Sequence, residues 1–161
     1  MLPYDNNEHF GISTKSVLVN YNFHFRFAKK YIKSGSVLDV GAGFCNLKDW
    51  LPLEVNYKAI DATKWICDAG EATYCDIMDY DGEQVDYICI FGVFESFKDL
   101  KPLADKLKLI AKKEILFCFT PAADIENYFY QHTYESVIEA FGECVFEHRM
   151  YSEILGRYII G

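Results

Sequence analysis

The most constraining feature of this sequence is the spacing of its short apolar runs. Five of them are separated by helix-periodic or polar stretches that can cross between parallel strands: residues 36–40, 57–61, 73–75, 85–91 and 115–120. The last two runs, residues 144–151 and 155–160, are only three residues apart, which permits an antiparallel hairpin and no helical crossover. This order predicts an α/β sandwich with a mostly parallel sheet and a C-terminal antiparallel hairpin.

Apolar residues at helical spacing predict the helices between these strands. The longer ones cover residues 13–32, 99–113 and 133–141, and shorter pieces cover residues 46–51 and 64–69. The first is expected either as one amphipathic helix or as a helix broken near residues 20–22. About ten residues separate the second and third strands, so some crossovers are expected to be loops instead of full helices.

The composition fits one domain. A chain of 161 residues that is 51% hydrophobic and 25% charged can bury a single core, and no Gly/Ser-rich or Pro-rich linker divides it. We expect a single domain over residues 1–161, with residues 1–35 as an N-terminal helical cap and residues 36–161 as the sheet core. The net charge of −8 makes nucleic acid an unlikely partner.

The sequence indicates neither membrane insertion nor metal binding. No apolar run reaches the roughly eighteen residues of a membrane-spanning helix, and the first eight residues lack the pattern of a secretory signal. We therefore expect a soluble, cytoplasmic protein. No two of the six cysteines are closer than eight residues, so there is no C-x-x-C pair and no metal site is predicted. Cys89 and Cys118 lie inside apolar runs and are predicted to be small core residues.

A glycine-containing turn follows the first predicted strand. Gly41 and Gly43 stand in the segment V-L-D-V-G-A-G-F-C-N, where glycines allow a sharp turn and a close approach of the backbone to a ligand. Asp61 comes twenty positions after Gly41, at the end of the second strand, where a carboxylate can accept both hydroxyls of a ribose. The combination predicts a cofactor that contains a nucleoside.

Two cofactor classes share these features. The NAD fingerprint G-x-G-x-x-G requires a third glycine where this chain has Asn46, which disfavours a nicotinamide enzyme without removing it as an alternative. Over essentially its whole length the chain resembles class I S-adenosylmethionine-dependent methyltransferases, whose motifs match D-V-G-A-G at residues 39–43, C-D-I at 75–77 and I-C-I-F-G-V-F-E at 88–95. The resemblance implies a Rossmann-like three-layer α/β sandwich and S-adenosylmethionine as cofactor.

The resemblance assigns five residues to the methionine end of the cofactor. Gly41, Ala42 and Gly43 would form the loop that packs its main chain against the methionine part. Asp39 would brace that loop or reach the ammonium through water, and the Phe91 carbonyl would accept from the ammonium. The family often carries a glycine or another small residue at the position of Cys45.

The resemblance also assigns four residues to the nucleoside end. Asp61 would bind the ribose diol, and Ala62 would lie beside the adenine. The Asp76 carboxylate would accept from the adenine amino group, while the Ile77 N–H donates to a ring nitrogen. From the residues alone, Asp79 and Asp81 are alternatives to Asp76, since all three acids stand in one polar stretch.

The chemistry of methyl transfer leaves few catalytic residues to predict. If the acceptor needs a base, Glu95 is the first candidate, with His9 and His132 as alternatives, while His24 and His148 are interpreted as structural. The chain is too short for a separate recognition domain, so residues 4–10, residues 122–132 or the second subunit of a homodimer would contact the acceptor.

The acidic charge favours a small-molecule or protein acceptor that is neutral or cationic. The main hypothesis is an active methyltransferase. The alternative is a non-catalytic S-adenosylmethionine-binding or partner subunit of a larger assembly.

Overall fold

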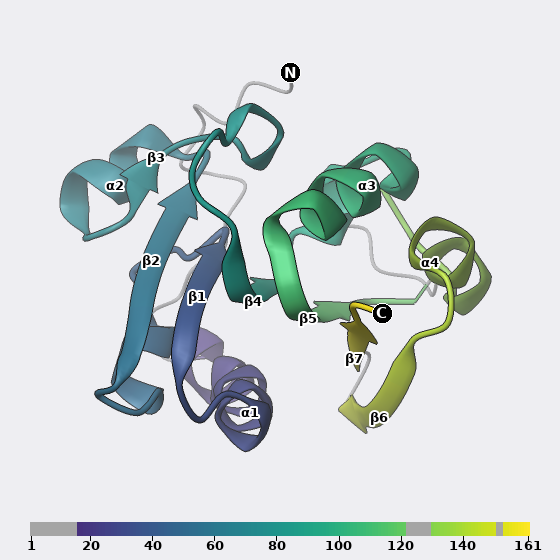
Figure 1. The fold of residues 1–161 in the computed structure, drawn as a ribbon, viewed down its shortest axis with the longest axis horizontal. Coiled ribbons are helices and arrows are strands. Elements are labelled where there is room, and N and C mark those ends of the chain that lie inside the picture. The colour runs from purple at the N-terminus through teal and green to yellow at the C-terminus, as the bar shows by residue number, and fades with distance from the viewer. Residues whose placement is uncertain (1–15, 122–129, 151–152) are drawn as a thin grey trace.

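The computed structural model describes residues 16–121, 130–150 and 153–161 (Figure 1). The chain order of helices and strands follows the predicted alternation. The helices are α1 (Ser16–Tyr31), α2 (Lys64–Ala69), α3 (Leu100–Ile110) and α4 (Tyr134–Phe141), with 3₁₀ turns η1 (Asn46–Trp50), η2 (Ile77–Asp79) and η3 (Phe94–Ser96). The strands are β1 (Gly35–Val40), β2 (Val55–Asp61), β3 (Thr73–Tyr74), β4 (Val85–Phe91), β5 (Ala111–Phe119), β6 (Val145–Met150) and β7 (Glu153–Ile159).

All seven strands form one sheet in the order β3-β2-β1-β4-β5-β7-β6. The pairs among β1 to β5 are parallel, and β7 runs antiparallel to both β5 and β6. The predicted C-terminal hairpin is therefore confirmed, and its second strand inserts beside β5. The order reverses at β1, which places β2 on one side and β4 on the other, so a crevice opens there at the carboxyl ends of the strands.

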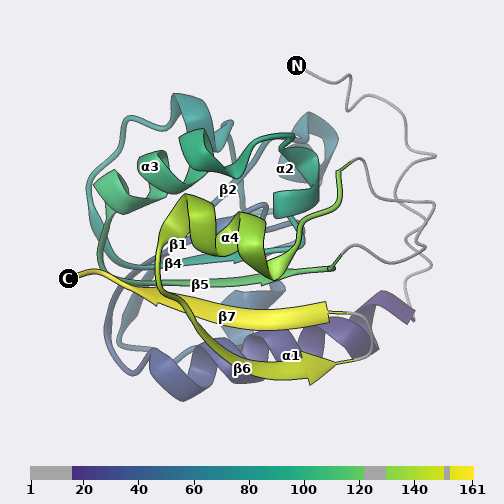
Figure 2. The ribbon, with the colours of Figure 1, turned by 90° about the vertical axis from the view of Figure 1, so that its right-hand side faces the viewer.

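Helices cover both faces of the sheet and make three layers (Figure 2). On one face, α1 and η1 pack on β1, β4 and β5 through a cluster that includes Phe27, Ile32, Leu47, Leu116 and Leu155. On the other face, α3 and α4 pack on the same strands through a larger cluster rich in phenylalanine. The alternation of side chains along each strand supplies both clusters, because neighbouring residues point to opposite faces.

The α3 helix shows how local sequence sets these elements. The Asp99 carboxylate caps it by accepting from the Lys101 N–H at 2.9 Å, and Pro102 falls in the first turn, as predicted. Its buried face consists of Leu100, Leu103, Ala104, Leu107 and Ile110. The helix ends where the chain joins the sheet.

Two C-terminal strands hold the N-terminal helix. The His24 ring of α1 lies 2.7 Å from the Glu153 carboxylate of β7, and Lys30 Nζ lies 2.5 Å from the Glu147 carboxylate of β6. Tyr31 also donates its hydroxyl hydrogen to Glu147. These contacts join residues that are more than a hundred positions apart.

Four sequence predictions need correction. The helix predicted over residues 99–113 is wrong at its end, because Ala111 pairs with Val85 and already belongs to β5. The second and the last strands start at Val55 and Glu153, each two residues before the predicted position. The piece predicted over residues 46–51 is a 3₁₀ turn. The first helix is unbroken from Ser16 to Tyr31, and residues 13–15 lie outside the described part of the chain.

Among the described residues no helix is long and apolar enough to cross a membrane.

Candidate functional site

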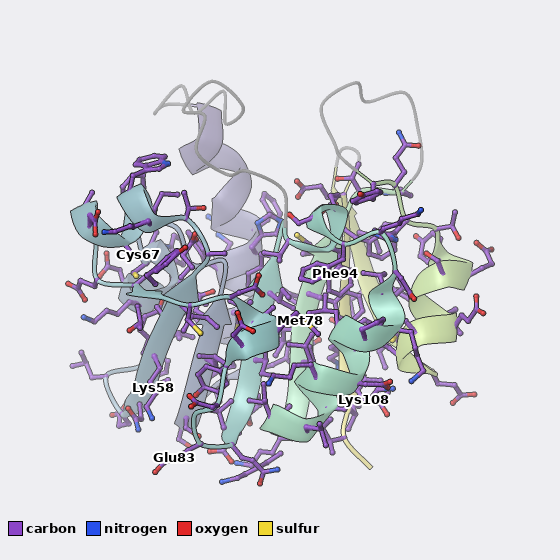
Figure 3. The ribbon with its side chains drawn as sticks, turned by 90° about the horizontal axis from the view of Figure 1, so that it is seen from above. Lys58, Cys67, Met78, Glu83, Phe94 and Lys108 are labelled. Carbon is purple, nitrogen blue, oxygen red and sulfur yellow. The ribbon has the colours of Figure 1, made fainter. Side chains whose placement is uncertain are left out.

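The carboxyl ends of β1, β2 and β4, together with the segment after β3, enclose a cavity of about 170 Å³. Figure 3 looks onto the sheet face covered by α3. There Cys67, Met78 and Phe94, from the segments that follow β2, β3 and β4, lie toward one end of the strands, and Lys58 and Glu83 lie toward the other (Figure 3). Segments that are distant in sequence therefore meet at one edge of the sheet.

Seven of the nine residues predicted to bind the cofactor line this cavity: Gly41, Gly43, Asp61, Ala62, Asp76, Ile77 and Phe91. The sequence did not single out the other lining residues, which are Val40, Thr63, Ile66, Cys75, Gly92, Val93, Ser96 and Phe97. Most of them are chain neighbours of a predicted residue. A position just after the end of a predicted strand is the sequence signal that could identify such residues.

The glycine turn after β1 is fixed against both neighbouring strands. Gly41 has φ +69°, and a Cβ on it would lie 2.4 Å from a methyl carbon of Val93, so a side chain does not fit there. The N–H groups of Gly41 and Ala42 both donate to the Ile60 carbonyl of β2, at 2.9 and 3.1 Å. The turn is thereby held at the mouth of the cavity. Ala42 itself does not line the cavity and packs beside Cys45.

Asp61 presents a carboxylate whose position is fixed by the backbone. One oxygen accepts from the Gly43 N–H at 3.0 Å, and the other accepts from the Thr63 N–H at 2.8 Å. The residue is 7% exposed and lines the cavity. Each carboxylate oxygen can accept a second hydrogen bond, so Asp61 can also receive two hydroxyl groups of a ligand.

Asp76 is the member of its acidic stretch that reaches the cavity. Its Oδ1 caps η2 by accepting from the Met78 N–H at 2.9 Å, and the adjoining Ile77 side chain is buried. Asp79 and Asp81 are exposed and do not line the cavity. Apolar residues such as Val40, Ile66 and Val93 also line the cavity. A cavity with apolar walls and a few fixed acceptors suits a ligand that is partly planar and partly polar.

Asp39 lies behind the glycine turn and does not line the cavity. Its carboxylate is 5% exposed and accepts from the Tyr57 hydroxyl at 2.6 Å. Burial raises the pKa of Asp39 from its usual 3.8 to about 7. The Tyr57 hydrogen bond opposes this rise in pKa, and the nearby Asp61 charge adds to it.

Glu95 is buried at the carboxyl end of β4 and does not line the cavity. Its Oε1 accepts from the Thr120 N–H at 2.7 Å, and burial raises the pKa of its carboxyl. His132 is also buried, with Nε2 2.9 Å from the carbonyls of Phe94 and Phe97, so it ties two segments together. His9 and the side chain of His148 lie outside the described residues.

Cys45 is a feature of the turn that sequence reasoning left unexplained. It has φ +59° and is the one described non-glycine residue with positive φ. An L-residue pays about 1–2 kcal/mol for this conformation, which glycine adopts freely.

Several solved structures share the fold of this chain. NodS, an N-methyltransferase from Bradyrhizobium japonicum WM9 crystallised with S-adenosyl-L-homocysteine, superposes with a TM-score of 0.72 at 14% identity, covering 98% of this chain and 94% of that one. Magnesium protoporphyrin IX methyltransferase from Synechocystis PCC 6803, with bound SAM, gives 0.69 at 13% identity over 90% and 79%. The chain has the class I methyltransferase fold.

A third methyltransferase structure agrees. A SAM-dependent methyltransferase from Aquifex aeolicus gives a TM-score of 0.67 at 14% identity, covering 86% of this chain and 89% of that one. No family model and no curated protein matches the sequence. At such identities the likeness defines the methyltransferase fold, and the roles of individual residues rest on the geometry of the cavity.

Proposed function

We propose that this chain is an S-adenosylmethionine-dependent methyltransferase that acts on a small-molecule or protein acceptor. One observation carries the proposal: residues from four separate segments, chosen from motif positions, line one cavity at the switch point of a methyltransferase fold. The similar structures crystallised with SAM or S-adenosyl-L-homocysteine support this choice of cofactor.

The nucleoside would lie between the ends of β2 and β3. Asp61 is already held by two N–H groups and would accept the ribose hydroxyls without reorganising. Asp76 uses one oxygen to cap η2, and its other oxygen would accept from the adenine amino group. Ile77 would donate its N–H to the ring, and Ala62 would pack beside it.

The methionine part would lie along the glycine turn. Apart from the chain neighbours of Gly43, no atom of the described residues lies within 4 Å of the place where its Cβ would stand, so a ligand can approach its backbone closely. Gly41 and Ala42 hold the turn in place, and Asp39 braces it from behind through Tyr57. The Phe91 carbonyl would accept from the ammonium at the end of β4.

The cofactor supplies both the methyl group and the leaving group, so this chain mainly has to position the acceptor and exclude water. Glu95 is our candidate for the base when the acceptor must lose a proton. Its raised pKa suits proton transfer, and its place after β4 is close to the end of the cavity formed by Gly92, Val93 and Ser96. Glu95→Gln is expected to lower kcat and remove one limb of the pH profile while cofactor affinity stays unchanged.

Calorimetric titration with S-adenosylmethionine tests the cofactor. Asp61→Asn is expected to weaken binding about 100-fold, because a hydrogen bond to a charged group contributes about 1.5–3 kcal/mol. Asp68→Asn is the matched control, since Asp68 is exposed on α2 and pairs only with Lys64 among the described residues. An unchanged dissociation constant for Asp61→Asn would contradict the ribose assignment.

Methyl transfer needs a second experiment. The protein is incubated with methyl-labelled S-adenosylmethionine and a cell extract, and labelled products are separated. Label on one product class confirms an enzyme and identifies the acceptor, whereas binding without any transfer favours the non-catalytic subunit. Absence of cofactor binding, with NADH bound instead, would favour the nicotinamide alternative.

A further inference from the structure

Three side chains with metal-binding chemistry meet beneath the end of β4. They are His24 of α1, Cys118 of β5 and Glu153 of β7, and their ligand atoms lie within 4.8 Å of one another. His24 is 3% exposed and Cys118 is 1% exposed, while Glu153 is half-buried. A buried nitrogen donor, a buried sulfur donor and a half-buried oxygen donor therefore lie close together.

The residues that line the cofactor cavity also hold this cluster. The His24 ring stacks on the Phe91 ring, with centroids 5.2 Å apart and planes inclined by 13°. The Gly92 N–H donates to the Cys118 sulfur at 3.1 Å. Stacking fixes the orientation of the imidazole, and an N–H bond to sulfur is a typical support for a metal thiolate. Each donor is thus oriented before any ion arrives.

The donor spacing requires only small movements. Ligand atoms around a tetrahedral zinc ion lie about 3.3–3.8 Å apart, given metal–ligand distances of about 2.0–2.3 Å. His24 Nε2 and Glu153 Oε2 are 2.7 Å apart and would separate by about 0.6 Å, while the widest separation in the cluster, up to 4.8 Å, would contract by about 1 Å. Rotation about side-chain bonds covers such shifts.

The charge around the cluster favours a cation. Glu95 is a second buried acid nearby, and its Oε2 has no hydrogen-bond partner within the described part of the chain. Among the described residues, His24 is the one basic side chain paired with Glu153. Buried acids without enough positive partners are costly, and a divalent ion would balance them.

We propose that His24, Cys118 and Glu153 form a binding site for one divalent transition-metal ion of the zinc class. Imidazole and thiolate donors favour zinc, cobalt or iron over magnesium and calcium, which prefer oxygen alone. Three protein ligands leave a fourth position for water or another ligand. On binding, the Cys118 thiol releases its proton to solvent. The proton between His24 Nε2 and the Glu153 carboxylate also leaves, and a neutral His24 keeps its one proton on Nδ1, so that Nε2 and a Glu153 oxygen each bind the ion.

The site does not depend on the proposed methyl transfer. The three ligands come from positions 24, 118 and 153, so no short spacing motif reveals them. Only the packing of α1 on the sheet and the insertion of β7 beside β5 bring them together. Binding of the metal alone is therefore the appropriate measurement.

Cobalt titration tests the site directly. The purified full chain is freed of metal with a chelator, the chelator is removed, and Co²⁺ is added while the absorption spectrum is recorded. We expect one Co²⁺ per chain, with a thiolate-to-cobalt charge-transfer band and visible bands typical of a four-coordinate ion. Absence of a charge-transfer band at saturation would overturn the proposal.

Variants assign the ligands. Cys118→Ala is expected to lose the charge-transfer band, whereas Cys89→Ala keeps it, because Cys89 is an equally buried cysteine on the neighbouring strand. A band that survives in Cys118→Ala overturns the assignment. Glu153→Gln preserves the shape of the side chain and is expected to weaken Zn²⁺ binding at least about 100-fold, since even outer residues around a metal contribute about 10–100-fold.

A stability measurement keeps the test decisive if Cys118→Ala does not fold. Zn²⁺ is expected to raise the Tm of the wild-type chain, because the ion would join α1, β5 and β7. In Glu153→Gln the same Zn²⁺ concentration should produce little or no increase. An equal increase in both proteins would contradict the proposed site.

Discussion

Asp39 provides the sharpest test of the physical reasoning behind the site. Its carboxylate is buried under the glycine turn and accepts a hydrogen bond from the Tyr57 hydroxyl, and burial raises its pKa to about 7. A buried carboxylate with a raised pKa destabilises the fold whenever it is ionised. Asp39→Asn keeps the shape and an acceptor for Tyr57 but cannot ionise. We therefore expect this variant to be more stable than the wild type at neutral and alkaline pH.

The expected size follows from the two pKa values. Between the unfolded value of 3.8 and the folded value of about 7, the folded chain holds a proton that the unfolded chain has lost. The free energy of unfolding therefore falls by about 4 kcal/mol in all as pH rises through this window, and it does not change further at higher pH. Roughly 2.5 kcal/mol of this loss falls between pH 5 and pH 8. The stability advantage of Asp39→Asn over the wild type should therefore grow by about 2.5 kcal/mol between pH 5 and pH 8.

Urea unfolding at pH 5 and pH 8 measures the effect. The difference between variant and wild type isolates Asp39, because other titrating groups are common to both proteins. Asp49→Asn, at an exposed acid on η1, is the control and should show no growing advantage. If Asp39→Asn is less stable than the wild type at pH 8, or its advantage does not change with pH, the electrostatic account of Asp39 is wrong.

Three further substitutions test the turn and the core. Gly41→Ala should cost about 1–3 kcal/mol through its positive φ and its clash with Val93, measured by urea unfolding, and a Val93→Ala background should recover part of the loss. Cys45→Gly should be about 1 kcal/mol more stable than Cys45→Ala, because only the glycine relieves the φ of +59°; equal stabilities would refute the strain. Phe94→Ala should cost about 3–5 kcal/mol, since the ring is fully buried and stacks on its neighbours, whereas exposed Leu53→Ala should stay within about 0.5 kcal/mol.

The sequence predicts well which segments form strands along the chain, because turns and apolar runs are local signals. The prediction from sequence fails where pairing in the sheet outweighs the local preference of a segment for a helix. Residues 111–113, Ala-Lys-Lys, suit a helix, but pairing of Ala111 with Val85 starts β5 there. The 3₁₀ character of η1 follows the left-handed Cys45, whose φ angle leaves no pattern in the sequence.

The residues of the candidate site also fall into two groups, one that is predictable from the sequence and one that is not. Residues that follow strand ends are predictable, and the choice of Asp76 over Asp79 and Asp81 agrees with the cavity lining. Side chains that meet through tertiary packing are not predictable from spacing. Glu95 was selected by position alone, and only the structure places its carboxylate on the Thr120 N–H. The sequence predicts a structural role for His24 from its place in the middle of an amphipathic helix, and only the structure brings its ring to Glu153, 129 residues away.

The contacts between α1 and the C-terminal hairpin also bear on how the chain folds. His24 and Tyr31 meet partners that are synthesised more than a hundred residues later, at Glu153 and Glu147. Contacts of such long sequence separation carry a large loop-closure cost and form slowly. The polar contacts of α1 to the hairpin therefore have to wait until residues 147–153 have left the ribosome, whereas α1 can already pack on β1, β4 and β5. The apolar cluster around Phe27 and Ile32 is completed only after that point, because Leu155 of β7 belongs to it.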